Sequence, residues 1–163
     1  MVTFFVILII VACILAARKD KHNKEEDDLA IANLPSFSIL AKPMSTFSKI
    51  INLAINKRQL LHSFSYTNGT VTLVTEDGRW LSSELSNLKV QFEKVNGIVS
   101  YSLTSKNQKM KFYQTTNITS QEWDAINGVL CLASTTWGSS IFSKQAKNLG
   151  RVITAMKFIK AIS

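Results

Sequence analysis

The chain has 163 residues and a formal net charge of +8, with 46% hydrophobic and 18% charged residues. This composition excludes an intrinsically disordered chain, because enough apolar side chains are present to form a core. The sequence divides into an apolar segment at 1–17, a charged segment at 18–35 and a remainder at 36–163. That remainder has the length of one ordinary domain.

The apolar segment carries no charge and reads MVTFFVILIIVACILAA. A helix of this length spans about 25 Å, slightly less than a hydrocarbon core of about 30 Å, and we expect a transmembrane anchor. The expected membrane-facing residues are Phe4, Phe5, Ile7, Leu8, Ile9, Ile10, Val11, Ile14 and Leu15. A cleaved signal peptide is the alternative. Such peptides begin with a positive region, and here no Lys or Arg precedes the apolar run.

Basic residues follow the apolar segment at once and set the expected orientation. They are Arg18, Lys19, Lys21 and Lys24. Because basic residues that flank a span stay on the cytoplasmic side, we expect a single-pass protein whose domain faces the cytoplasm. An extracytoplasmic domain is the alternative, since a folded domain can override the flanking charge.

Turn dipeptides and alternating polarity predict a sheet between residues 60 and 116. Asn68-Gly69, Asp77-Gly78 and Asn96-Gly97 suit two-residue hairpin turns, because Asn, Asp and Gly tolerate positive φ. The expected strands lie near 60–66, 70–76, 79–85, 88–95, 98–104 and 109–115. We expect them to form one six-stranded antiparallel meander in an α+β domain.

The same turns sort the side chains onto two faces of the predicted meander. The apolar face collects Phe64, Tyr66, Val71, Leu73, Trp80, Leu88, Val90, Phe92, Val99, Tyr101, Leu103, Met110 and Phe112. The polar face collects Ser63, Ser65, Thr67, Thr70, Thr72, Ser83, Lys89, Gln91, Glu93, Ser100, Ser102, Thr104, Lys109 and Lys111. One face therefore needs a cover, and the other is a plausible docking surface.

Three helices are expected to cover the apolar face. The segment 45–59 carries apolar residues at the spacing of one helix face. The sequence Thr119-Ser-Gln-Glu122 resembles a capping box at the start of a second helix. A third helix at 140–162 has an expected apolar face of Phe142, Ala146, Leu149, Val152, Ile153 and Met156.

Two basic groups are candidate surfaces for a membrane or a partner. Lys144, Lys147 and Arg151 on the final helix could contact anionic lipid. We favour a simpler interpretation, in which that helix covers the sheet and its basic residues face water. Lys89, Lys109 and Lys111 on the polar face could contact an acidic protein or nucleic acid. Tyr113 is the single aromatic residue there for stacking bases, so no specific nucleic-acid site is predicted.

We expect one histidine, His62, and one carboxylate, Glu84, on the apolar side of the sheet, with His62 near Thr75. Neither has a partner at the spacing of a catalytic triad or a metal site. We therefore predict no catalytic, cofactor-binding or metal site, and a protein that is not an enzyme.

These patterns favour a membrane-tethered interaction or scaffold domain that binds a protein partner in a membrane-associated assembly. If 37–40 forms a strand, the order of strand, helix, six strands and long helix resembles the helix-grip arrangement. A sheet followed by an amphipathic helix is similar to the pleckstrin-homology arrangement. These resemblances imply an alternative, the binding of a lipid or another apolar ligand. A membrane-associated nucleic-acid binder is a third hypothesis.

Overall fold

The computed structural model describes residues 6–18, 33–133 and 141–163, and within 141–151 only the backbone. It divides the chain into two units, Met1–Asn33 and Leu34–Ser163. In the first unit, residues 6–18 are helical and their large apolar side chains are exposed.

Among the described residues, no helix combines the length and the apolarity that a membrane span requires. The predicted transmembrane anchor therefore has no support from the described structure. Five residues of this prediction lie outside the described residues: Phe4, Phe5, Lys19, Lys21 and Lys24.

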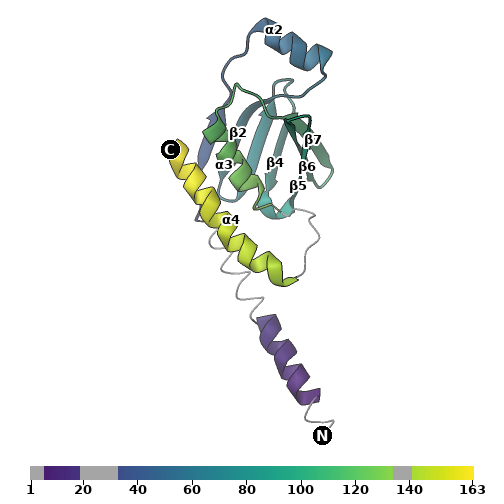
Figure 1. Ribbon diagram of the computed structural model, residues 1–163, viewed down its shortest axis with the longest axis vertical. Coiled ribbons are helices and arrows are strands. Elements are labelled where there is room, and N and C mark those ends of the chain that lie inside the picture. Colours follow the sequence, from purple (N-terminus) through teal and green to yellow (C-terminus); the bar gives the residue numbers. More distant parts are fainter. Residues whose placement is uncertain (1–5, 19–32, 134–140) are drawn as a thin grey trace. The chain divides into compact units, whose positions relative to one another are not determined.

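The second unit is an α+β fold, as the sequence predicts, but its strands form two sheets and not one (Figure 1). The four-stranded sheet has the order β1 (Phe37–Leu40), β2 (Leu61–Thr67), β3 (Thr70–Thr75) and β4 (Trp80–Glu84). The three-stranded sheet has the order β5 (Leu88–Val95), β6 (Ile98–Ser105) and β7 (Gln108–Tyr113). All neighbouring strands are antiparallel.

The single six-stranded meander was the wrong prediction because the chain leaves the sheet after β4. A turn of 3-10 helix, η2 (Leu85–Asn87), separates β4 from β5. The two sheets meet elsewhere, through a parallel bridge between Leu60 and Tyr113. A buried hydrogen bond of 2.8 Å from Ser105 Oγ to Ser83 Oγ also joins them.

The Asn-Gly turns fix the register as predicted. Both residues of Asn68-Gly69 have positive φ, +47° and +80°, and both residues of Asn96-Gly97 do so as well, at +51° and +78°. Positive φ at both central positions defines the turn whose twist matches that of a hairpin. The pairs that follow from these turns, such as Phe64 with Leu73 and Phe92 with Tyr101, are therefore present.

The turn at Asp77-Gly78 is one residue longer than predicted. The amide of Thr75 donates to the carbonyl of Arg79 at 2.8 Å and closes a three-residue loop, with Gly78 at φ +85°. This is the hairpin geometry in which a glycine in the left-handed region follows a tight turn. Leu73 consequently pairs with Leu81, and every side chain of β4 changes face.

The shifted register corrects three expectations about β4. Trp80, predicted on the apolar face, is 62% exposed, and Leu81 is buried in its place. Ser83, predicted on the polar face, is buried. Glu84, predicted on the apolar side, is exposed.

The helix α3 (Ser120–Leu130) begins at the predicted capping box. Thr119 Oγ1 accepts from the Glu122 amide at 3.2 Å, and Glu122 Oε2 accepts from the Thr119 amide at 3.0 Å. The helix then places Trp123 against the inner face of β5–β7, where its ring stacks on Tyr101 with centroids 5.6 Å apart. The helix α3 therefore covers the inner face of the sheet β5–β7.

The helix α4 (Ile141–Ile162) packs against α3. Among its described side chains, Val152, Ala155 and Ile159 are buried and share one side of the helix. Ile153, predicted to be inside, is 62% exposed. The two helices approach closely at Gly128, where a Cβ atom would lie 2.9 Å from the Cα of Ala155.

The predicted covering role of the segment 45–59 is wrong. The segment forms α2 (Thr46–Lys49) and a wider π-helical turn, η1 (Ile50–Ile55), and neither has a buried residue. Figure 1 shows α2 beyond the ends of the strands and not over a sheet face. Four of its apolar residues, Phe47, Ile50, Ala54 and Ile55, are therefore exposed.

Candidate functional site

The outer face of the sheet β5–β7 carries the predicted group of basic residues. The strand register aligns Lys89 with Thr104 and Lys109, and it aligns Lys111 with Ser102. All three lysines are exposed. The second predicted group, Lys144, Lys147 and Arg151, lies outside the described side chains.

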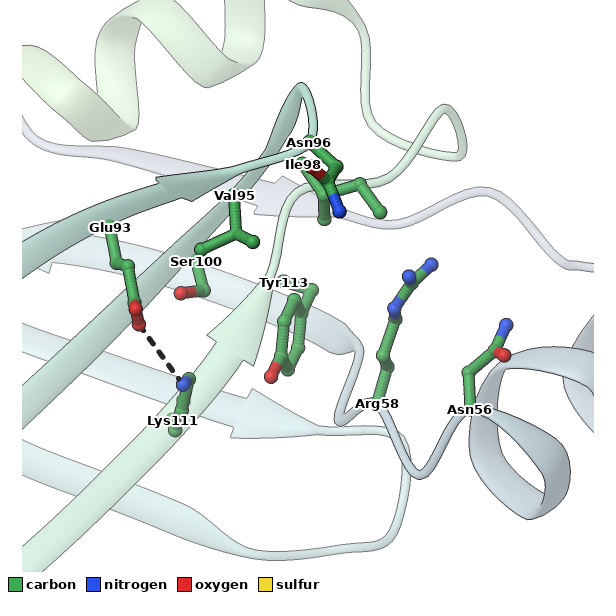
Figure 2. A pocket seen from close by; sticks show the side chains of 9 residues that line it. All are labelled: Asn56, Arg58, Glu93, Val95, Asn96, Ile98, Ser100, Lys111 and Tyr113. Carbon is green, nitrogen blue, oxygen red and sulfur yellow. Dashed lines mark hydrogen bonds and ion pairs between the residues drawn. The ribbon is translucent and has the colours of Figure 1, made fainter.

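A groove opens at the end of this outer face, beside the Asn96-Gly97 turn (Figure 2). Its volume is about 340 Å³. It is lined by Asn56, Arg58, Glu93, Val95, Asn96, Ile98, Ser100, Lys111 and Tyr113. The sheet supplies most of this lining, and the segment that follows η1 supplies the rest.

Backbone pairing between distant segments places Arg58 in the groove. The amide of Tyr113 donates to the carbonyl of Gln59 at 2.9 Å, next to the parallel bridge between Leu60 and Tyr113. This pairing brings the Arg58 guanidinium carbon to 5.8 Å from the centroid of the Tyr113 ring. At that distance a guanidinium is attracted to the ring face.

Lys111 is the second cation of the groove. Its Nζ lies 5.4 Å from the centroid of Tyr113 and 3.4 Å from Glu93 Oε2. The Coulombic interaction with Tyr113, and then the hydrogen bond to Glu93, raise the pKa of Lys111. Both side chains of this ion pair are well exposed, so the pair contributes at most about 1 kcal/mol.

The groove keeps an excess of positive charge. Among the described residues, Arg58 has no carboxylate within ion-pairing distance, whereas Lys111 forms an ion pair with Glu93. Val95 and Ile98 provide an apolar wall beside the cations. The volume is at the lower end of the ~300–1,000 Å³ typical of ligand sites, so the groove fits a small anionic group next to an apolar one.

The position of Tyr113 bears on nucleic-acid binding. Figure 2 shows its ring between the side chains of Lys111 and Arg58. A nucleobase that stacked on this ring would have to displace one of the two cations. The groove is therefore better suited to a carboxylate than to a base.

The predicted position of His62 is wrong because β2 contains a bulge. The register shifts between Leu61 and Ser63, so Leu61 is buried and His62 points outward. The His62 side chain is 48% exposed, and its Nδ1 lies 3.3 Å from Glu76 Oε1. Within the part of the chain that the structure describes, no three His, Cys, Asp or Glu side chains converge as a metal site.

Aromatic side chains fill the space between β5–β7 and α3. The Tyr101 ring stacks on Phe112 and Trp123, and its hydroxyl donates to Asn127 Oδ1 at 2.7 Å. Burial raises the pKa of Tyr101 to about 12. An apolar ligand at this place would have to separate stacked rings.

Arg58 and Asn56 were not among the predicted site residues. Their place in the groove depends on a pairing between the start of β2 and the end of β7, which no local pattern encodes. No protein-family model matches the chain, and comparisons with curated proteins and with solved structures give no match.

Proposed function

We propose that the chain is a membrane-tethered, non-enzymatic binding domain that docks an acidic segment of a partner protein on the outer face of β5–β7. The groove carries this proposal. In it, Arg58 and Lys111 flank Tyr113 beside an apolar wall. Charge-assisted hydrogen bonds from Arg and Lys to carboxylates are stronger than neutral ones, so a glutamate or aspartate of the partner suits this position.

The residues around the groove extend its preference for acidic side chains along the sheet. Lys89 and Lys109 continue the positive charge on the outer face, and Glu93 is the one acid of the groove lining. Among the described strands, β5 pairs with β6 alone, so its other backbone edge is the place where an extended peptide could add a strand. Backbone pairing would give affinity, and the cations would select acidic side chains.

The tether is the uncharged apolar segment 1–17. The support for it is the sequence, which has no charged residue from Met1 to Ala17. The basic residues that begin at Arg18 support an orientation with the domain in the cytoplasm. This orientation gives the docking face access to cytoplasmic partners.

A peptide-binding assay tests the docking face. The full chain in lipid nanodiscs is titrated with fluorescent decapeptide pools that alternate Asp or Glu with Val or Leu, and with matched pools that contain Asn or Gln. The acidic pools should bind more tightly, and Arg58→Glu with Lys111→Glu should weaken that binding at least about ten-fold, equivalent to about 1.4 kcal/mol. Lys157→Glu on the exposed side of α4 is the matched control and should change little. Equal affinity for acidic and neutral pools would contradict the proposal.

Alkaline carbonate extraction tests the tether separately. The chain should remain with the membrane fraction, and Ile10→Arg should release part of it, since a central arginine opposes insertion by about 2.5–3.5 kcal/mol. Ile10→Leu is the matched control and should stay with the membrane. A wild-type chain that carbonate extracts completely would refute the tether.

A further inference from the structure

The helical segment α2–η1, defined here as residues 46–55, exposes apolar side chains to an unusual degree. Phe47 is 73% exposed, Ile50 is 52% exposed and Ile55 is 68% exposed, and the segment has no buried residue. Single exposed apolar residues are ordinary on a protein surface, but a group of them on one short helix marks an interaction site.

The segment is amphipathic, and its π-helical turn broadens the apolar side. Phe47, Ile50 and Ala54 follow the spacing of one helix face, with Ser48 and Lys49 on the other side. The Asn56 amide donates to the Ile51 carbonyl at 2.9 Å, the i→i+5 bond of a wider turn. The side chains of residues five apart point in different directions on an α-helix, but they point more nearly to the same side on this wider turn. Ile55 thereby joins Ile50.

The charged residues nearest to the segment in the sequence are all positive. Lys42, Lys49 and Lys57 are exposed, and no Asp or Glu occurs between Leu29 and Thr75. An apolar helix side with flanking lysines is the pattern of a helix that lies in a membrane interface and attracts anionic lipids. A second copy of the chain is a poorer occupant, because it would bring the same lysines together.

We propose that α2–η1 lies in the interface of a bilayer that contains anionic lipids. The side chains of Phe47, Ile50 and Ile55 enter the boundary between headgroups and acyl chains, and Lys49 and Lys57 contact headgroup phosphates. This goes beyond the tether and the peptide groove, because it gives the folded domain its own contact with the membrane. It does not depend on the groove.

The tether leaves enough chain for this contact. Residues 18–33 can extend to about 55 Å at most, whereas the seven-residue strand β2 is about 23 Å long. The connecting residues are therefore longer than the strands. A domain held by residues 1–17 can bring α2–η1 to the bilayer whichever end of the strands faces it. Tethering raises the local lipid concentration, so a weak interfacial helix suffices.

A depth measurement on the full chain tests the proposal. The chain carries Cys13→Ala and Cys131→Ala, together with an NBD fluorophore on Phe47→Cys or Ile55→Cys. The matched control carries the fluorophore on Lys106→Cys, in the β6–β7 turn at the opposite strand end. Each protein is placed in nanodiscs of phosphatidylcholine with or without phosphatidylserine, and lipids that bear a doxyl quencher report contact with acyl chains.

We expect the fluorophores at 47 and 55 to shift to the blue and to be quenched in discs that contain phosphatidylserine, and much less in phosphatidylcholine alone. The fluorophore at 106 should show neither effect. Replacing Lys49 and Lys57 by Gln should lower the ratio of inserted to free helix about five-fold per lysine.

Three results would overturn the proposal. Fluorophores at 47 and 55 that stay in water in both lipids would show that the helix does not insert. A blue shift without quenching would show that protein and not lipid covers the face. Equal quenching in both lipids would refute the anionic preference. Lys111→Glu should weaken peptide binding but leave the quenching unchanged, so this proposal and the docking groove can fail separately.

Discussion

The buried phenol of Tyr101 should make the stability of the second unit fall at alkaline pH. Tyr101 is fully buried, and burial raises its pKa from 10.0 to about 12 in the folded state. The folded protein therefore holds this proton more tightly than the unfolded chain does. The resulting stabilisation is complete below pH 10 and is lost as the pH rises through about 12.

The size of this loss follows from the pKa difference. A rise of this size in the folded-state pKa corresponds to about 3 kcal/mol of unfolding free energy. Tyr101→Phe removes the titration, and near neutral pH it also removes the hydrogen bond to Asn127, which contributes about 0.5–1.5 kcal/mol. The variant should therefore be the less stable protein at neutral pH, and its deficit should shrink and then reverse above pH 10.

Urea unfolding in detergent, followed by tryptophan fluorescence, measures both proteins across this pH range. Phe92→Leu is the control, because Phe92 contacts Tyr101 at a centroid distance of 5.3 Å but does not titrate. It should lower the unfolding free energy by a similar amount at every pH. Parallel pH curves for the wild type and Tyr101→Phe would refute the reasoning.

Four substitutions test the packing and the cap of α3. Gly128→Ala should lower the melting temperature, because its Cβ would meet the backbone of Ala155 at 2.9 Å and the cost of overpacking, about 1–3 kcal/mol, exceeds the gain in helix propensity. A rise in melting temperature would contradict this close approach. Thr119→Ala should reduce the urea-derived stability by about 0.5–2 kcal/mol through loss of the helix cap, and no loss would count against the cap. Trp80→Ala should alter stability far less than Trp123→Ala, for which we expect about 3–5 kcal/mol, and equal losses in denaturant titrations would place Trp80 in the core.

The turn dipeptides explain how much of the sheet could be predicted. Asn68-Gly69 and Asn96-Gly97 are compatible with few turn types other than the two-residue turn in which both positions have positive φ. The cross-strand pairs on either side follow from these turns. Asp77-Gly78 also fits a three-residue loop in which only the glycine needs positive φ. The sequence could not separate these two loops, and the one-residue difference moved Trp80 out of the core and Leu81 into it.

The helix at 45–59 and the groove show that local sequence patterns do not reveal contacts between distant parts of the chain. Periodicity correctly indicated an apolar helix side, but it carries no information about what covers that side. The groove needs Arg58 beside Tyr113, and this contact depends on pairing between distant parts of the chain. The local pattern did place Lys89, Lys109 and Lys111 on one polar face, because that face follows from the strand register alone.

Site-specific photocrosslinking tests the docking face most directly. Benzoylphenylalanine at Val95, which lines the groove, is introduced into the full chain in the membranes of expressing cells. We predict adducts whose crosslinked partner peptides are rich in Asp and Glu. These adducts should be lost with Arg58→Glu and Lys111→Glu and retained with Lys157→Glu. Adducts that are indifferent to charge reversal at Arg58 and Lys111, or that form on neutral peptides, would contradict the proposed function.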